Sequence, residues 1–435
     1  MRSSPEPRFP SIYIDFLIAQ RKKHHSTSAK DQKPKGNLAL SPSSQAFNLV
    51  AKDIATLHFM LLGIPVLPPL FQRSFSGKTV VVTGNTGFKG SWLCLWLQKL
   101  GAKVVGIADE VPTEPSLYKL ADLESLIEQH WIDVENLPEL KSVIGDTQPN
   151  AVFHLAAQAI VSTSYENPVK TFSTNVMGTV HVLEAMRQLK KGVGVIITSD
   201  KCYDNVEWPW GYRENDPLGG KDIYSGSKGA AELAFKSYFH SFFRDTSGVR
   251  LATGRAGNVI GGGDWAKDRI VVDCISSWHQ GSAVAIRQPK ATRPWQHVLE
   301  PLSGYLTLAT SLMDDQKAHG QSYNFGPEAS QNRPVEDLLI DLAKAWGFDD
   351  PSQSYEITSP PSEWTEARLL KLNCDKALHD LAWMPTLQYE DVVRMTSEWY
   401  RNWHDGKVSD IRKFTDSQIE EYESVAQKRG RTWAS

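Results

Sequence analysis

Two clusters of side chains in this sequence are of types that move protons. The first is Ser199, Asp200 and Lys201, which follow a run of apolar residues. The second is Tyr224 with Lys228, whose spacing of four places the phenol and the ammonium on one face of a helix. A nearby ammonium favours the phenolate, so Tyr224 could take a proton from a hydroxyl near neutral pH. Taken alone, either cluster is more often a set of ordinary surface residues. Together with the glycine pattern at residues 83–90, a catalytic role is favoured.

The turn at residues 83–90 carries Gly84, Gly87 and Gly90, spaced three residues apart. Glycine allows the positive φ and the close backbone approach that a pyrophosphate needs, and a following helix offers unpaired N–H groups to the anion. A β-branched run precedes this turn and an apolar-periodic run follows it. The pattern therefore predicts a dinucleotide-binding turn.

Acidic residues further along could hold the adenosine end of such a dinucleotide. Asp109 and Glu110 follow the next apolar run, and Asp133 follows a later apolar pair. Asp109 could equally be an ordinary surface residue. No Arg directly follows the second strand, which favours NAD over NADP as the cofactor.

The elements that must position these residues alternate between two periods. Strands are expected at residues 79–82, 103–107, 151–155, 193–198 and 249–254. Helical periodicity covers residues 91–100, 168–189 and 224–243. This alternation predicts an α/β fold, a Rossmann-type doubly wound parallel sheet in which both proton-moving clusters lie near the carboxyl ends of strands. After Asn258 the pattern is broken, as expected of a smaller part that encloses a substrate.

Composition excludes several other classes of protein. The 47 Lys and Arg against 50 Asp and Glu give a net charge of −3, which provides no general attraction to nucleic acid or to an anionic membrane. The four cysteines, Cys94, Cys202, Cys274 and Cys374, are far apart and form no metal-binding pair. We therefore expect no metal site, and a reducing, cytoplasmic location.

The first part of the chain differs from the rest. Residues 1–75 hold ten Lys or Arg against four Asp or Glu, and residues 26–44 are rich in Ser, Pro and Lys. The apolar run at 54–71 is short and broken by prolines, so it is not expected to span a membrane. These patterns predict a disordered basic extension at 1–74, an NAD-binding domain at 75–257, a mainly substrate-binding part at 258–425 with segments returning to the sheet, and a tail at 426–435.

Several separate strings, in order, resemble one known family. The glycine turn, Tyr224, Lys228 and Asn258 resemble the extended short-chain dehydrogenase/reductase family, in its nucleotide-sugar branch. Within that branch the chain is similar to the CDP-glucose 4,6-dehydratases over residues 75–423. The matching strings are GFKGSW at 87–92, SDKCY at 199–203, GYRENDPLGG at 211–220, GNVIGGGDW at 257–265 and RPWQHV at 293–298.

The resemblance implies a role for each matching residue. It places NAD against Gly84, Thr86, Gly87, Phe88, Gly90, Asp133, Leu155, Ala156, Ala157, Asn175, Tyr224 and Lys228. It implies that the nucleotide sugar is held by Asn258, Arg269, Arg293, Gln296 and His297, with the two Arg forks suited to its diphosphate. His297 could equally be a packing residue. It also implies a homodimer or higher homo-oligomer, formed through helices within 168–189 and 224–243.

The implied reaction converts CDP-glucose to CDP-4-keto-6-deoxyglucose. Tyr224, assisted by Lys228 and Ser199, deprotonates the C4 hydroxyl while hydride passes to NAD. Water then leaves across C5 and C6, with Lys201 as the base and Asp200 as the acid. The hydride returns to C6, so NAD is not consumed and is expected to be tightly held.

Four positions depart from the family pattern, and two other functions stay open. Asn85, Ile223, Gly226 and Val272 stand where His, Pro, a larger polar residue and Pro are usual. Ile223 and Gly226 could loosen the backbone around Tyr224, which affects rate more than reaction type. The alternatives are an epimerase or a dehydratase for another nucleotide sugar, and a non-enzymatic NAD-binding sensor or scaffold on the same fold. An epimerase would have no use for the Asp200 and Lys201 pair.

Overall fold

The computed structural model describes residues 69–245, 248–358 and 369–435. The predicted basic extension, apart from its last residues, and most of the broken apolar run lie outside these described residues. The described residues belong to one compact unit.

A seven-stranded, entirely parallel sheet forms the centre of the fold. Its order is β11-β6-β5-β4-β1-β2-β3. The strands are β1 (Thr79–Thr83), β2 (Lys103–Ala108), β3 (Glu128–Trp131), β4 (Ala151–His154), β5 (Gly192–Ile197), β6 (Val249–Ala256) and β11 (Ser322–Phe325). The chain order reverses on either side of β1, so a ligand crevice is expected where β1 meets β4. The predicted doubly wound α/β class is confirmed.

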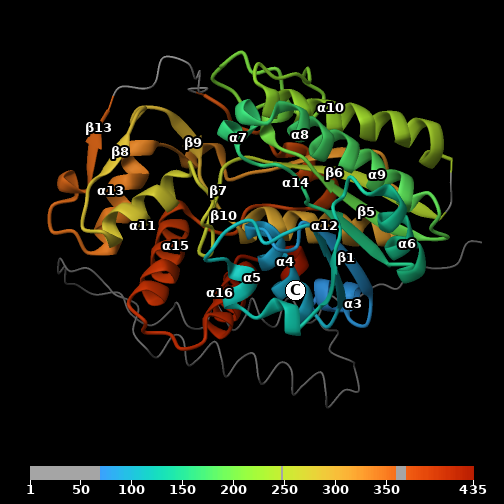
Figure 1. The fold of residues 1–435 in the computed structure, drawn as a ribbon, viewed down its shortest axis with the longest axis horizontal. Helices are drawn as coiled ribbons and strands as arrows, with labels where there is room; N and C mark the ends of the chain where they lie inside the picture. Colours follow the sequence, from blue (N-terminus) through green and yellow to red (C-terminus); the bar gives the residue numbers. More distant parts are fainter. Residues whose placement is uncertain (1–68, 246–247, 359–368) are drawn as a thin grey trace, which may run out of the picture. The chain divides into compact units, whose positions relative to one another are not determined.

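Helices cover both faces of the sheet, and each face has its own hydrophobic core (Figure 1). Successive valines of β1 serve opposite cores: Val80 and Val82 pack on one side, Val81 on the other. One face carries α6 (Leu137–Thr147), α7 (Val161–Glu166), α8 (Pro168–Phe172), α9 (Gly178–Met186) and α10 (Ile223–Tyr238). The other carries α3 (Leu70–Phe75), α4 (Phe88–Lys99), α5 (Leu117–Leu120), α12 (Leu299–Asp314) and α16 (Ile411–Lys428).

The later part of the chain builds small sheets beside the main one. Paired strands are β7 (Val259–Ile260) with β10 (Gln296–His297), β9 (Thr292–Pro294) with β12 (Asn332–Pro334), and β8 (Val284–Ile286) with β13 (Tyr355–Ile357). The helices here are α11 (Ile270–His279), α13 (Val335–Trp346), α14 (Asp375–Leu381) and α15 (Tyr389–His404). β11 leaves this part and pairs with β6 in the main sheet.

All five predicted strands form, and the main sheet has two more that the sequence did not reveal, β3 and β11. Both lie at sheet edges and carry polar residues, EQHW and SYNF, so neither shows the β-branched run that marks a central strand. The stretch predicted as one helix over 168–189 is α8, a π-helical turn η2 (Ser173–Met177) and α9. The π-helical turn η4 (Phe239–Phe243) likewise ends α10.

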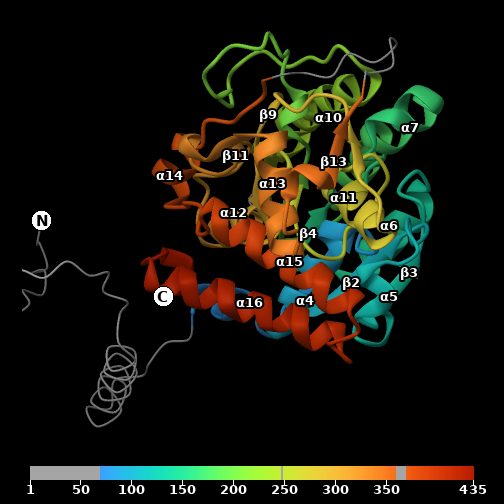
Figure 2. The same cartoon turned by 90° about the vertical axis from the view of Figure 1, so that its left-hand side faces the viewer.

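Both predicted ends of the folded part need correction. The helix α3 lies before residue 75, and its Phe71 and Phe75 are buried in the main core. At the other end, α16 runs alongside α4 (Figure 2) and is followed by a 3-10 turn, η7 (Thr432–Ala434). Trp433 in that turn stacks on Phe71, with ring centroids 4.8 Å apart. Residues 426–435 are thus not a separate tail, because Ala426, Trp433 and Ala434 are buried in the core.

Candidate active site

The first proton-moving cluster follows directly from the end of β5. Ser199 is extended and caps a single 3-10 turn, η3 (Asp200–Cys202), by accepting the Lys201 N–H on its hydroxyl at 3.2 Å. The same hydroxyl donates to Asp200 Oδ1 at 3.0 Å. This tight turn displays three neighbouring polar side chains at the carboxyl edge of the sheet, where ligands of parallel α/β sheets bind.

The helix α10 brings the second cluster to the same place. Asp222 caps it by accepting the Ser225 N–H at 2.9 Å, so Tyr224 lies in the first turn. Tyr224 shares a hydrogen bond with Ser199, and the ammonium of Lys228 lies 6.0 Å from the centre of the Tyr224 ring. Four of the five predicted catalytic residues, namely Ser199, Asp200, Tyr224 and Lys228, are therefore linked in one buried group, with Lys201 following Asp200 in the chain.

Burial sets the protonation tendencies of this group. It raises the pKa of Tyr224 to about 12, against the opposing effect of the Ser199 hydrogen bond, and lowers the pKa of Lys228 to about 8. Burial also raises the pKa of Asp200, although Lys201 and Ser199 oppose the shift. The Asp200 Oδ2 atom has no hydrogen-bond partner in the described structure. A carboxyl with a raised pKa and an unpartnered oxygen is suited to donate a proton to a ligand.

The glycine turn has the shape that a dinucleotide phosphate requires. Gly84 has φ +70°, and a Cβ there would lie 2.7 Å from the Ala156 nitrogen. A Cβ on Gly90 would lie 2.1 Å from the Gly84 carbonyl oxygen. Gly87 caps α4 without a side-chain hydrogen bond, so no side chain of the cap occupies the N–H groups of the first turn. The residues present therefore fit the pyrophosphate of NAD.

The other predicted cofactor residues surround this turn. The Thr83 hydroxyl accepts the Ala156 N–H at 3.2 Å, and the Thr86 hydroxyl donates to the Glu110 carbonyl at 2.7 Å. Asn175, in the π-helical turn η2, donates to Ser227 of α10 at 2.8 Å and accepts the Gln158 N–H. It thereby ties the loop after β4 to the helix that carries Tyr224. π-helical turns often occur at functional sites.

The adenosine end stays a prediction. Asp133 pairs with Lys170 at 2.8 Å and accepts the Glu135 N–H, while Asp109 accepts the N–H of Glu110. Both aspartates follow strands, β2 and β3, at the same sheet edge.

Two of the five predicted substrate residues are arginines whose charges act on the proton-moving side chains. Arg293 and Arg269 interact electrostatically with Asp200 and Tyr224, respectively. Arg269 also pairs with Asp264 at 2.9 Å. Gln296 and His297 are buried; Gln296 donates to the Phe325 carbonyl. Burial lowers the pKa of His297 to about 3, and its ring lies edge-on to Trp92. Asn258 directly precedes β7 and is half-buried.

One site residue was not predicted from the residue types. Lys89 interacts electrostatically with Asp200, Arg269 and Lys228, and burial together with the two cations lowers its pKa to about 8. It lies within the matching string GFKGSW, but a Lys at the start of a helix such as α4 looks like an ordinary surface residue.

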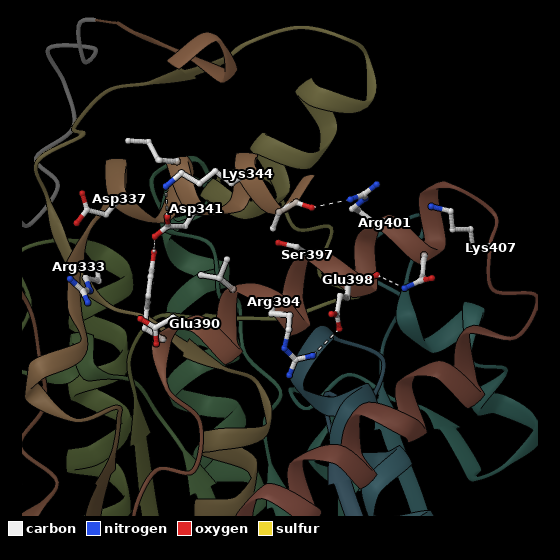
Figure 3. A pocket seen from close by; sticks show the side chains of 15 residues that line it. Arg333, Asp337, Asp341, Lys344, Glu390, Arg394, Ser397, Glu398, Arg401 and Lys407 are labelled. Carbon is white, nitrogen blue, oxygen red and sulfur yellow. Dashed lines mark hydrogen bonds and ion pairs between the residues drawn. The ribbon is translucent and has the colours of Figure 1, made fainter. Parts of the chain in front are cut away.

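A separate groove of about 1030 Å³ lies between α13 and α15 (Figure 3). Some of its charged side chains pair with one another: Lys344 with Asp341 at 3.1 Å and Arg394 with Glu398 at 3.0 Å. It contains none of the predicted site residues. Among the described residues, no cluster of three or more metal-binding side chains occurs, and no helix is long and apolar enough to cross a membrane.

Comparison with known proteins identifies the family. Residues 81–396 match the model of the family described as GDP-mannose 4,6 dehydratase. The chain belongs to this dehydratase family. A curated dehydratase, CDP-glucose 4,6-dehydratase of Salmonella typhimurium, is 46% identical over 341 residues, which cover 77% of this chain and 94% of that protein. The resemblance to the CDP-glucose 4,6-dehydratases and the lyase class are thereby confirmed.

More distant relatives of this dehydratase share its fold. CDP-paratose 2-epimerase of Salmonella typhi is 25% identical over 74% of this chain and 98% of that protein. The crystal structure of the dTDP-glucose 4,6-dehydratase DesIV of Streptomyces venezuelae, with NAD and TYD bound, has a TM-score of 0.66 at 18% identity. The match covers 77% of this chain and 99% of that one. The architecture is therefore that of dehydratases and epimerases alike, and only the side chains distinguish them.

Proposed function

We propose that the protein catalyses the NAD-dependent dehydration of CDP-glucose to CDP-4-keto-6-deoxyglucose. The observation that carries this proposal is the buried group in which Asp200, next to Lys201, is hydrogen-bonded to Ser199, the partner of Tyr224. An oxidation needs only the Tyr224 end of this group. The acid and base at 200 and 201 serve the elimination that distinguishes a dehydratase from an epimerase.

The steps of the reaction divide among the residues by their functional groups. NAD, when bound, accepts a hydride from C4 and returns it to C6. Tyr224 accepts the proton of the C4 hydroxyl, and the ammonium of Lys228 favours its phenolate. The resulting ketone acidifies C5, where Lys201 removes the proton. Asp200 donates its proton to the C6 hydroxyl, which leaves as water, and Lys201 then returns a proton to C5.

The substrate is held from the later part of the chain. Arg269 and Arg293 bind the diphosphate, because their guanidinium forks match phosphate oxygens and their charges already face the reacting group. Asn258, Gln296 and His297 complete the sugar and base contacts. The cytidine preference is supported by the 46% identity to the Salmonella CDP-glucose enzyme.

The protein functions as a homodimer. Apolar side chains of α8, η2, α10 and η4 are exposed: Val169 82%, Phe172 40%, Met177 45%, Leu233 55% and Phe242 43%. A second copy would cover this face. Light scattering of the wild-type protein and of Leu233→Glu checks it; a monomeric wild-type protein would contradict it.

The four free cysteines favour a reducing compartment, and we place the protein in the cytoplasm.

The test is incubation of the purified protein and NAD with CDP-glucose, UDP-glucose, dTDP-glucose and GDP-mannose separately, followed by mass spectrometry. Loss of one water from CDP-glucose alone supports the proposal. Loss of water from another sugar only would reassign the nucleotide, and an isomer of unchanged mass would indicate an epimerase. NAD binding without any product would favour the sensor or scaffold.

A further inference from the structure

A buried ion pair lies directly behind the catalytic helix face. Glu232 is eight residues after Tyr224 and four after Lys228, so the three side chains follow one face of α10. Its carboxylate binds the guanidinium of Arg255 on β6 through two hydrogen bonds, at 2.9 Å from Nε and 2.8 Å from Nη2. The side chains are only 2% and 3% exposed. A pair this deeply buried contributes little net stability, because desolvation of the two charges offsets their attraction.

Both ends of the catalytic segment 199–202 are attached to this pair. On one side, Thr198 donates its hydroxyl to Glu232 Oε1 at 2.5 Å. On the other side, Arg255 Nη1 donates to the hydroxyl of Tyr203 at 2.7 Å, and Tyr203 donates to Asn324 at 2.8 Å. Ser199, Asp200 and Lys201 thus lie between Thr198 and Tyr203, each of which is hydrogen-bonded to one member of the Glu232–Arg255 pair. Glu232 belongs to α10, the helix that carries Tyr224.

We propose that Glu232 and Arg255 are positioning residues that set the placement of the elimination pair, Asp200 and Lys201, relative to Tyr224. This inference rests on the proposed function. The reaction requires three groups to reach C4, C5 and C6 of one sugar ring, and these groups come from two different elements. A shift of about 1 Å between such elements can lower the rate about 100-fold.

The carboxylate of Glu232 also acts on Lys228 at longer range. Glu232 and Cys202 favour the charged form of Lys228, whereas burial disfavours it. The other titratable groups that face Lys228 are Lys89, His154 and Tyr224. Loss of the Glu232 charge would therefore lower the pH at which Lys228 loses its proton.

The chain offers a matched pair of variants that tests the attachment. Thr198 and Thr253 both donate a hydroxyl to Glu232, at 2.5 and 3.1 Å, but only Thr198 adjoins the catalytic segment. Valine has nearly the shape of threonine and leaves no buried charge behind. We expect Thr198→Val to lower kcat on CDP-glucose about tenfold with KM changed less than about threefold, and Thr253→Val to change kcat less than about twofold.

A second measurement uses Glu232→Gln, with Glu300→Gln as its control. Glu300 is also buried and hydrogen-bonded, to the N–H groups of Thr386 and Leu387, in a different part of the core. We expect the alkaline limb of the kcat profile to move to lower pH in Glu232→Gln only.

Equal losses of kcat in both threonine variants, or unchanged kcat in both, would overturn the inference. So would an unchanged pH profile in a folded Glu232→Gln. If Glu232→Gln does not fold, the threonine pair still decides. A wild-type protein that binds NAD but does not dehydrate CDP-glucose would instead contradict the proposed function.

Discussion

At the scale of single residues, the active site depends on burial of groups that would otherwise be ordinary. Tyr224 and Lys228 are both below 9% exposed, and burial moves their pKa values apart, raising that of Tyr224 to about 12 and lowering that of Lys228 to about 8. A phenol with a raised pKa keeps its proton unless the phenolate is stabilised. The Ser199 hydrogen bond and the charge of Arg269 lower the pKa of Tyr224 in this way, and the Lys228 ammonium lies 6.0 Å from the centre of the ring.

Replacing Tyr224 by Phe removes the group that accepts the C4 proton. We expect kcat on CDP-glucose to fall roughly 100- to 10,000-fold, the range for loss of a general acid or base. Steady-state kinetics with mass detection measures it. Tyr238→Phe, at the other end of the same helix, is the control and is expected to retain full activity. A Tyr224→Phe enzyme with unchanged kcat would exclude this role.

Replacing Asp200 by Asn separates the two halves of the reaction. The amide cannot donate a carboxyl proton to the C6 hydroxyl, whereas Tyr224 still serves the C4 oxidation. We expect nicotinamide absorbance to show reduction of the cofactor while mass spectrometry shows roughly 100-fold less loss of water. Normal water loss in Asp200→Asn would show that another group supplies the proton.

At the scale of elements, α10 has to meet the loop after β4 and the turn η3 at the same time. Asn175, in the π-helical turn η2, makes one of these contacts through Ser227. Gly229 allows the approach to η3, because a Cβ there would lie 3.3 Å from the Cys202 carbonyl oxygen and 2.9 Å from that of Gly219. Gly226, one turn earlier on the same helix, has no such contact: its Cβ would lie 3.8 Å from Phe172.

Replacement by alanine is therefore expected to have opposite effects on stability at Gly226 and Gly229 of α10. We expect Gly226→Ala to stabilise the protein by about 0.5–1 kcal/mol, because alanine loses less backbone entropy in a helix and meets only an ordinary contact. We expect Gly229→Ala to be destabilising, because backbone would have to move. Thermal unfolding of both variants checks this, and a lower Tm for Gly226→Ala would contradict it.

At the scale of the whole molecule, the last residues close the core beneath the sheet (Figure 2). Trp433 stacks on Phe71 and Tyr422 and meets Trp96 edge-on, so it joins α3, α4 and α16. We expect Trp433→Ala to lower the free energy of unfolding by about 3–5 kcal/mol. Trp210, 60% exposed, is the control, and its replacement by Ala is expected to change stability by less than about 0.5 kcal/mol. Denaturant titration distinguishes the two; equal small effects would show that the C-terminus is not a structural part of the core.

Two buried histidines make the free energy of unfolding depend on pH in the acid range. Burial lowers the pKa of His154 and of His297 to about 3, below the ordinary value of 6.5. The unfolded chain therefore binds protons first, and stability falls as pH drops from 6.5 toward 3, by roughly 2 kcal/mol per histidine at pH 5. We expect His297→Gln to flatten this dependence, and exposed His379→Gln to leave it unchanged. Equal slopes for wild type and His297→Gln would contradict the assignment.

The sequence by itself determined the elements whose signal is local. The β-branched run and glycine spacing at 79–90 predict strand, turn and helix, because each depends on neighbouring residues only. The spacing of Tyr224 and Lys228, and the adjacency of Ser199, Asp200 and Lys201, likewise predict which side chains act together. The structure links Ser199, Asp200, Tyr224 and Lys228 in one group, as expected.

Only the tertiary structure decided which side chains from distant segments of the chain share one buried environment. Nothing local marks Glu232 and Arg255 as partners, Lys89 as a neighbour of Asp200, or Trp433 as a core residue. The edge strands β3 and β11 also escaped prediction, because sheet neighbours rather than their own residues specify them. The physical reason is common to all: burial and pairing arise from contacts between segments far apart in the chain, and sequence periodicity reports only contacts within a segment.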